Sequence, residues 1–170
     1  MIKLDVGSGG KAAPYLGEGW LGVDPFVETA DVKAPMWELP YPDNSVAAIF
    51  SSHALEHVAK AQVPVTLKEW YRVLQPGGVL ILRIPDLEWC CKWFLEHPTT
   101  GWDMDVIFGN QQHGGEFHKT GFTLRIAMQY LLDAGFLIMK YEELKTHAQK
   151  TMSFEALKVV FQPPQPEPNP

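Results

Sequence analysis

The sequence predicts an α/β protein built on a doubly wound, mostly parallel sheet, and two observations lead to this class. Short runs rich in β-formers alternate with amphipathic helical patterns along the chain, which is typical of parallel strands joined by crossover helices. The chain has 170 residues, 46% of them hydrophobic and 20% charged, and this size and composition fit one globular domain with a sizeable core. We therefore expect residues 1–161 to form a single domain.

Several short runs are expected to form strands, because each is rich in apolar or β-branched residues and is bounded by turn residues. The run near Asp31 is the weakest of them. In chain order, the expected strands are Ile2–Val6, Trp20–Asp24, Asp31–Ala34, Val46–Ser51, Val79–Ile84, Phe136–Tyr141 and Phe154–Phe161.

A first helix is predicted before the strand at Val79. Leu67, Trp70, Tyr71 and Leu74 recur at i, i+3, i+4 and i+7, which places apolar side chains on one helical face. The segment that follows, from Gln75 to Gly78, contains a proline and two glycines and is expected to end this helix.

Two further helices are marked by their caps. Asp86 is the predicted N-cap of the second helix, and Thr123 is that of the third, which ends at Gly135. Both cysteines fall on the apolar stripe of the second helix, so we expect them to be core residues. The predicted inward-facing residues are Leu87, Cys90, Cys91, Phe94 and Leu95 in the second helix, and Ala127, Tyr130, Leu131 and Ala134 in the third.

Composition limits the classes of partner. The net charge is -6, and the basic residues are spread singly along the chain, which argues against bulk nucleic-acid binding and against a membrane-surface protein. No apolar run approaches the roughly 18 residues of a membrane span. The only two cysteines are adjacent, a strained arrangement for a disulfide, so we expect a cytoplasmic protein in a reducing compartment. Gln162–Pro170 contains five prolines in nine positions and is expected to be a disordered tail.

A glycine-rich turn, from Asp5 to Gly10, ends the first expected strand. Glycines there allow a tight turn and a close approach of the backbone to a ligand. Asp24 ends the neighbouring strand, where a carboxylate can accept hydrogen bonds from two ribose hydroxyls. Together these features predict a nucleoside site. The alternative is that the glycines only form a turn and that Asp24 begins the Asp24-Pro25 turn.

Three motifs in order carry a resemblance to a known family. The first is the glycine-rich turn. The second, from Leu39 to His57, reads Leu-Pro-Tyr-Pro-Asp-Asn-Ser-Val-Ala-Ala-Ile-Phe-Ser-Ser-His-Ala-Leu-Glu-His, and the third, from Glu69 to Gly78, reads Glu-Trp-Tyr-Arg-Val-Leu-Gln-Pro-Gly-Gly. Over roughly residues 2 to 85 the chain strongly resembles class I S-adenosylmethionine (SAM)-dependent methyltransferases. The resemblance implies a Rossmann-like seven-stranded sheet of order 3-2-1-4-5-7-6 with the last strand antiparallel, SAM as cofactor and S-adenosylhomocysteine (SAH) as product.

The resemblance also implies which residues bind the cofactor. It assigns the methionine end of SAM to the turn after the first strand, the ribose to the end of the second strand, and the donor methyl group to the end of the fourth. The corresponding residues are Asp5, Gly7, Ser8 and Gly9 for the methionine end, Asp24 and Pro25 for the ribose, and Ser52 and His53 for the methyl group.

The chain departs from the family pattern at several positions. Lys11 replaces the usual third glycine, and Pro14 interrupts the first helix, which is expected to be short or absent. Pro35 stands where the family's aspartate contacts adenine, so we expect the Met36 N–H or packing from Trp37 to bind the adenine. The chain starts directly at the first strand, so the pocket is expected to be more open than usual, or completed by an oligomer or a partner subunit.

Histidines suggest further chemistry. His53-Ala54-Leu55-Glu56-His57 fits H-x-x-E-H, a zinc-protease pattern that needs a helix and a third ligand; its place directly after a buried strand favours the reading without a metal. The loop from His113 to Phe122 is expected to lie over the strand ends. His118 is the preferred general base, with His53 as a second candidate catalytic residue. The alternative is that His113 and His118 only anchor the loop.

The expected function is transfer of the SAM methyl group to an O, N or C nucleophile, with a small molecule as the expected acceptor. Catalysis would come chiefly from aligning that nucleophile with the sulfonium. One alternative is a catalytically silent SAM-fold binding or scaffold protein, which Lys11 and Pro35 favour. A nicotinamide-dependent oxidoreductase is disfavoured, because the Gly7–Ala12 segment lacks the last glycine of G-x-G-x-x-G.

Overall fold

The computed structural model describes residues 1–97, 102–112, 115–145 and 150–159. The described strands form one six-stranded sheet of order β2-β1-β3-β4-β6-β5. β1, β2, β3 and β4 are mutually parallel, while β6 is antiparallel to both of its neighbours. Their bounds are Ile2–Val6 (β1), Trp20–Val23 (β2), Val46–Ser52 (β3), Leu74–Pro85 (β4), Phe136–Lys145 (β5) and Lys150–Lys158 (β6).

The expectation of seven strands is wrong for the described residues, because the weak run near Asp31 forms only a one-residue parallel bridge, between Val32 and Val23. Two backbone hydrogen bonds join Val32 to β2 and to Asp24, and beside them the N–H of Gly22 donates to the Asp31 carboxylate at 2.8 Å. The predicted tail, Gln162–Pro170, lies outside the described residues.

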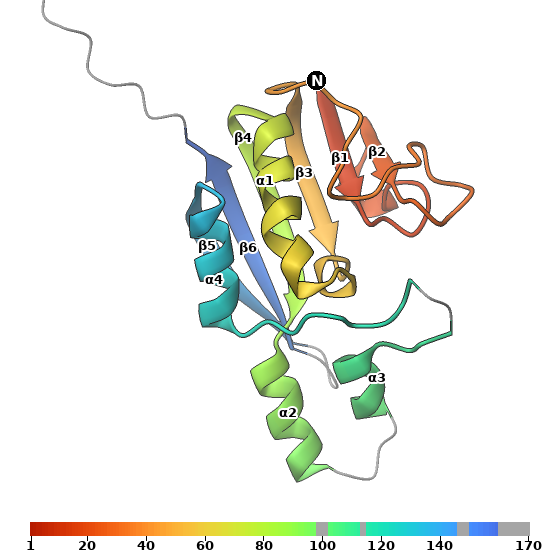
Figure 1. Ribbon diagram of the computed structural model, residues 1–170, viewed down its shortest axis with the longest axis vertical. Helices are drawn as coiled ribbons and strands as arrows, with labels where there is room; N and C mark the ends of the chain where they lie inside the picture. Colours follow the sequence, from red (N-terminus) through yellow and green to blue (C-terminus); the bar gives the residue numbers. More distant parts are fainter. Residues whose placement is uncertain (98–101, 113–114, 146–149, 160–170) are drawn as a thin grey trace, which may run out of the picture.

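Two helices, α1 (Val63–Val73) and α4 (Leu124–Asp133), cover one face of the sheet (Figure 1). The predicted apolar faces make this contact, since Leu67 and Trp70 of α1 and Leu131 of α4 are all 0% exposed. They join the inward-facing strand side chains in one hydrophobic core. The predictions of these two helices are confirmed except at the end of the first: α1 stops at Val73, so Leu74 and the predicted turn Gln75–Gly78 belong to β4.

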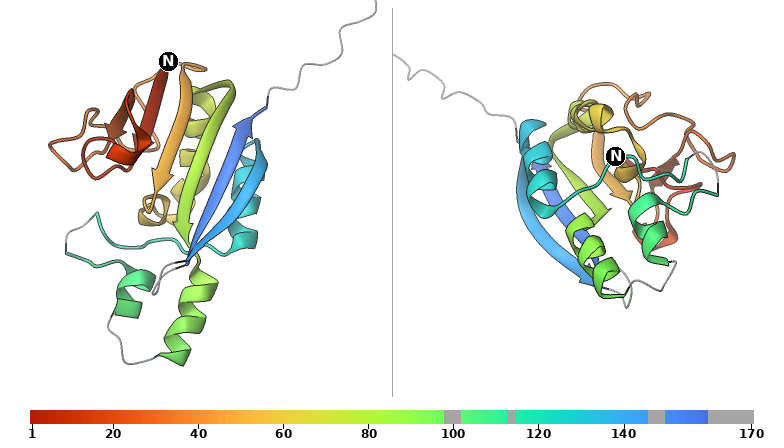
Figure 2. Two further views of the ribbon diagram at one scale, coloured as in Figure 1. Left: turned by 180° about the vertical axis from the view of Figure 1, so that it is seen from behind. Right: turned by 60° about the horizontal axis from the view of Figure 1, so that its bottom comes forward.

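The opposite face of the sheet has no α-helix packed across it in the described part of the chain (Figure 2, left), so the doubly wound expectation is met on one face only. The reason lies in the crossovers. The one after β1 contains only a 3-10 turn, η1 (Pro14–Leu16), and the one after β2 contains no helix. Side chains on this face are consequently less buried, as at Leu137 and Met139, which are 49% and 57% exposed.

Helices α2 (Leu87–Glu96) and α3 (Trp102–Phe108) lie beyond the carboxyl end of β4 (Figure 1). Asp86 caps α2 as predicted, accepting from two backbone N–H groups. The predicted core stripe is wrong for Cys91 and Leu95, which are exposed, whereas Cys90 is buried. The cause is that α2 packs against the short α3, which the sequence did not predict, and not against the sheet. None of the described helices has both the length and the apolar character needed to cross a bilayer.

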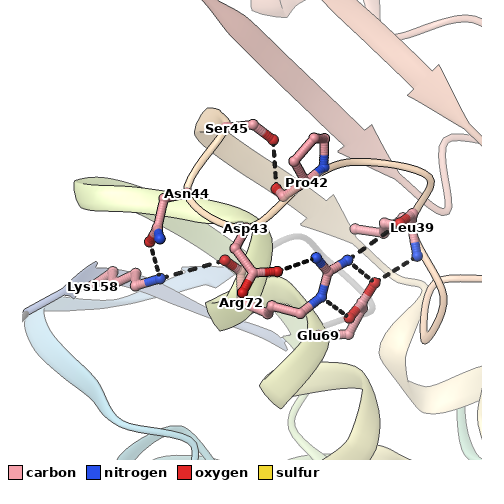
Figure 3. A network of polar contacts seen from close by, with 8 residues as sticks. All are labelled: Leu39, Pro42, Asp43, Asn44, Ser45, Glu69, Arg72 and Lys158. Atoms are coloured by element: carbon pink, nitrogen blue, oxygen red, sulfur yellow. Dashed lines mark hydrogen bonds and ion pairs between the residues drawn. The ribbon is translucent and has the colours of Figure 1, made fainter.

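A polar network holds the segment before β3 against α1 (Figure 3). Arg72 donates to both carboxylate oxygens of Glu69, at 2.7 and 2.8 Å, and to Asp43 at 2.6 Å. The same Glu69 carboxylate accepts the backbone N–H of Leu39 at 2.7 Å. Met36 and Trp37, which shortly precede Leu39 in this segment, line the candidate site, so the network also restrains one of its walls.

Candidate functional site

A cavity of about 360 Å³ opens at the carboxyl ends of β1, β2 and β3. This is where open α/β sheets bind ligands, and the volume lies in the range of small-molecule sites. Four segments distant in sequence meet in its wall: the turn after β1, the segment after β2, the segment after β3, and the loop at 115–119. The lining residues are Gly7, Gly9, Asp24, Pro25, Phe26, Val27, Met36, Trp37, His53, Ala54, His57, Val58, Gln62, Gly115, Glu116 and Lys119.

The turn after β1 approaches the cavity with backbone alone. Gly7 has φ +75°, and a Cβ there would lie 2.2 Å from the Cβ of Ala54. Gly9 has φ +64°, but a Cβ there would meet nothing within 4 Å. Gly7 is thus required for packing the turn against the segment after β3, while Gly9 leaves open space where a ligand can contact the backbone.

Asp24 follows β2 and is only 8% exposed. Its Oδ1 accepts the N–H groups of Phe26 and Val27, at 2.8 and 3.1 Å, and its Oδ2 accepts that of Gly9 at 3.0 Å. A carboxylate offers about four acceptor positions, so backbone donors use most of them. Oδ2 has room for one ribose hydroxyl, and a second hydroxyl would have to share or displace a backbone donor.

Met36 and Trp37 line the same cavity, with Pro25 and Phe26 on the Asp24 side. The indole N–H of Trp70, a fully buried residue of α1, donates to the Met36 carbonyl at 2.9 Å. A core side chain therefore fixes the segment that the sequence predicted to contact adenine.

His53 lines the cavity directly after β3. Its φ is +52°, a left-handed conformation that is uncommon for a residue with a side chain and that persists where surrounding contacts impose it. Those contacts are a backbone hydrogen bond to Arg83, a 3.1 Å contact between the ring Nε2 and Thr151 Oγ1, and a 3.5 Å contact between Nδ1 and Glu56. The imidazole is held at the cavity wall.

Three predicted cofactor residues do not line the cavity. Ser52 precedes His53 at the end of β3, and Ser8 turns its hydroxyl toward the Gly10 carbonyl. Asp5 is 3% exposed and accepts the N–H of Ala13 at 2.8 Å. Burial raises the pKa of the Asp5 carboxyl, an effect that the Ala13 hydrogen bond opposes. Asp5 is therefore hydrogen-bonded to the backbone that follows the glycine-rich turn and does not line the cavity.

The structure places His118 behind His57, away from the lining of the 360 Å³ cavity. The two rings meet edge to face, with centroids 4.9 Å apart. His118 lines a second, smaller cavity together with Glu56. Burial lowers the pKa of the His118 imidazole, while the Glu56 carboxylate and a hydrogen bond to the Val106 backbone oppose this shift.

Glu56 is only 1% exposed, and neither of its carboxylate oxygens has a hydrogen-bond partner among the described residues. Its neighbours are imidazoles: His53 at 3.5 Å, and His57 and His118, whose candidate ligand atoms and that of Glu56 all lie within 4.8 Å of one another. The segment is a 3-10 turn, η2 (Leu55–His57), so the helical H-x-x-E-H arrangement of a zinc protease does not form.

Sequence reasoning missed several lining residues. His57 lies in the H-x-x-E-H motif, for which the reading without a metal is favoured. Lys119 lies in the loop from His113 to Phe122, which is expected to cover the strand ends. Residues 113 and 114 of that loop are outside the described residues. Gly115 and Glu116 lie in the same loop as Lys119. Gln62 belongs to no motif, and the other missed positions are apolar residues that carry no chemical signal. The missed lining residues are Phe26, Val27, Ala54, His57, Val58, Gln62, Gly115, Glu116 and Lys119.

The site fits a nucleoside with a polar tail. A buried carboxylate lies beside a glycine turn whose backbone borders open space, and Met36 and Trp37 offer an apolar surface for a base. On the other side, His53, His57 and Lys119 provide polar groups for a second molecule. The cavity thus has two chemically different sides.

Comparison with known proteins agrees with this fit. A family model described as a methyltransferase domain matches residues 4–82, the part of the chain that contributes the glycine turn, Asp24, Met36, Trp37 and His53. A search of curated protein sequences found no match.

Solved structures share the fold at low identity. A SAM-dependent methyltransferase from Methanosarcina mazei has a TM-score of 0.66 at 20% identity, covering 94% of this chain and 92% of its own. One from Thermotoga maritima, a possible histamine N-methyltransferase, has a TM-score of 0.66 at 18% identity, covering 92% and 82%. The Burkholderia thailandensis 1,6-didemethyltoxoflavin-N1-methyltransferase, with 1,6-didemethyltoxoflavin and S-adenosylhomocysteine bound, has a TM-score of 0.68 at 15% identity, covering 94% and 71%.

Proposed function

We propose that this chain is a class I SAM-dependent methyltransferase, in which residues 1–161 act as one domain that transfers the methyl group of SAM to an O, N or C nucleophile of a small molecule. The observation that carries the proposal is that one cavity brings together the glycine turn, Asp24, Met36 and Trp37 with the polar side chains of His53, His57 and Lys119. When bound, SAM supplies an electrophilic methyl group on a sulfonium.

On the cofactor side, we assign the ribose to Asp24, the amino-acid end to the backbone of Gly7 and Gly9, and the adenine to Met36 and Trp37. Asp5 and Ser8 support the turn in this assignment, and Ser52 positions His53. The Asp24 carboxylate is already oriented by three backbone N–H groups, so little side-chain freedom is lost when it accepts a ribose hydroxyl.

On the acceptor side, His53 is the catalytic residue that we propose to contact the incoming nucleophile. It is held in place by Thr151 and Glu56, and positioning supplies much of the rate enhancement in a direct displacement. An imidazole can also take the proton of an O–H or N–H acceptor. His118, the base preferred from the sequence, would act through His57, which separates it from the cavity. A small acceptor is supported by the neighbour solved with 1,6-didemethyltoxoflavin.

Calorimetric titration with SAH tests the cofactor half of the proposal. We expect saturable binding at one site per chain and a loss of roughly 10- to 100-fold in affinity for Asp24→Ala, because hydrogen bonds to charged groups contribute about 1.5–3 kcal/mol. Glu38→Ala, which removes an exposed carboxylate nearby in sequence, is the matched control and should bind as the parent does. Absence of binding at millimolar SAH would refute the proposal.

Turnover tests the second half. Incubating the protein with SAM and a panel of small O-, N- and C-nucleophiles should yield SAH with at least one acceptor. Binding of SAH without turnover of any panel member, together with co-purification of a catalytic subunit, would instead favour the scaffold alternative.

A further inference from the structure

We propose that Glu56, His57 and His118 form a binding site for one divalent first-row transition-metal ion, with Zn²⁺ as the ion to test first. The candidate ligand atoms of these three residues lie within 4.8 Å of one another. Two imidazole nitrogens and one carboxylate are a donor set that zinc uses in catalytic sites, where a fourth position stays open.

The burial of the Glu56 carboxylate is a second observation that supports the metal site, and it is independent of the distances between the ligand atoms. A carboxylate that is 1% exposed is costly to bury unless it is paired or coordinates a cation, yet neither oxygen has a hydrogen-bond donor among the described residues. The Nδ1 of His53 lies 3.5 Å from Oε1, beyond the usual range of a hydrogen bond. A divalent ion would supply the missing positive charge and use the free lone pairs.

The two other histidines are oriented as metal ligands usually are, with one ring nitrogen hydrogen-bonded to the backbone. The Nδ1 of His57 lies 3.2 Å from the Phe117 carbonyl oxygen, and donation there leaves the Nε2 lone pair available. The ring of His118 hydrogen-bonds with the backbone of Val106. Each ring is therefore fixed through one nitrogen and has the other free for a cation.

The backbone brings these side chains together without a bound ion. The carbonyl of Glu56 accepts the N–H groups of Lys119 and Thr120, at 2.8 and 3.1 Å, and Thr120 Oγ1 donates to the Val58 carbonyl at 2.8 Å. These bonds tie the loop that carries His118 to the turn that carries Glu56 and His57. The site is therefore largely formed before binding, and small side-chain rotations would bring the ligand atoms to coordination distance.

The proposed ion would lie in the wall between the two cavities, because His57 lines the larger one whereas Glu56 and His118 line the smaller one. Its ligands do not include the glycine turn, Asp24, Met36 or Trp37. Binding of the metal and binding of SAH can consequently be measured separately, and failure of one leaves the other standing.

The experiment titrates the 170-residue chain, first stripped with EDTA, with Zn²⁺ by calorimetry and with Co²⁺ by visible spectroscopy. We expect one ion per chain and a Co²⁺ ligand-field spectrum. His57→Asn and His118→Asn should each weaken binding by more than the roughly 10- to 100-fold that loss of an outer-shell partner costs. His97→Asn, at an exposed histidine outside the cluster, is the matched control and should bind as the parent does.

Glu56→Gln separates a metal ligand from a structural carboxylate. The amide keeps the shape but removes a buried charge that has no hydrogen-bond donor among the described residues, so the metal-free variant should unfold at the same or a higher temperature than the metal-free parent, while its Zn²⁺ affinity falls. No uptake of Zn²⁺ or Co²⁺ by the parent would overturn the proposal. So would ligand variants that bind as tightly as the parent, or a metal-free Glu56→Gln protein that is strongly destabilised.

Discussion

At the scale of single residues, two glycines with similar backbone angles have different tasks in the turn after β1. Both Gly7 and Gly9 have positive φ, but only Gly7 has a neighbour, Ala54, where a Cβ would have to go. We expect Gly9→Ala to cost about 1–2 kcal/mol of stability, the strain of a left-handed alanine. Gly7→Ala adds a steric clash and should cost several times more.

Urea denaturation of the two variants measures this difference, with SAH titration as a second readout. Gly9→Ala should fold and bind SAH weakly, because the new methyl group enters the open space beside the turn. Equal losses of unfolding free energy would contradict the packing role assigned to Gly7.

His53 allows a test of catalysis without loss of the backbone conformation. Asparagine adopts left-handed φ more readily than most residues, so His53→Asn should keep the turn after β3 and remove only the imidazole. We expect kcat to fall by roughly 10²- to 10⁴-fold if the imidazole is a general base, with the dissociation constant of SAH nearly unchanged. A parallel loss of SAH affinity would show that His53 serves the cofactor and not the acceptor.

The candidate site was predictable from sequence where it is local. Gly7, Gly9, Asp24 and His53 each occur next to a strand end, so motif and strand prediction together placed them at one edge of the sheet. Contacts between segments far apart in the sequence were not predictable. His118 was the preferred general base, but it packs against His57 and does not line the cavity. The backbone N–H of Ala13 orients the Asp5 carboxylate, and no feature of the sequence predicts this hydrogen bond.

At the scale of elements, the network between α1 and the segment before β3 makes part of the stability dependent on pH. Hydrogen bonding from Arg72 is the largest cause that lowers the pKa of Glu69 below its ordinary value. A carboxyl with a depressed pKa in the folded state stabilises the protein above its unfolded-state pKa, and this contribution is lost as pH falls through the folded-state value.

Glu69→Gln should therefore lower the unfolding free energy at pH 7 by about 1–3 kcal/mol, since a charge-assisted hydrogen bond is lost. The difference from the parent should begin to shrink as pH falls below the ordinary glutamate pKa of about 4.3, and it should go on shrinking as pH falls towards the lower folded-state pKa of Glu69. Chemical denaturation at pH 3.5 to 7 measures it, with the exposed neighbour Lys68→Gln as control. A difference that stays constant over this range would rule out the charged Glu69–Arg72 pair as its source.

Elements with strong periodicity were predicted correctly, and those decided by tertiary contacts were not. The face containing Leu67 and Trp70 predicts α1 because four apolar positions repeat at helical spacing. The stripe through Cys91 has the same spacing, but it failed because α2 packs against α3 and lies beyond the sheet. The run at Asp31 was too short and polar to form a full strand, and it forms only a one-residue bridge to β2.

At the scale of the whole molecule, helices cover only one face of the sheet, so we expect truncation of a side chain on that face to cost more unfolding free energy than truncation on the other face. Leu80 and Ile81 are neighbours in β4, and their side chains point to opposite faces. Leu80 is 0% exposed under the helices, while Ile81 is only partly buried on the open face. Leu80→Ala should cost about 2–5 kcal/mol, the usual range for a fully buried leucine.

Ile81→Ala should cost less than about 2 kcal/mol, because a side chain that stays partly hydrated in the native state loses less on truncation. Both substitutions leave the backbone ladder of a central strand intact. Loss of the β-branched Ile81 also lowers strand propensity, which adds to the cost at that position, so a smaller cost there reports its lesser burial. Urea denaturation followed by circular dichroism gives the two unfolding free energies. Similar losses at both positions would mean that the second face is covered in solution, and a loss at Ile81 that grows with protein concentration would identify a second copy of the chain as the cover.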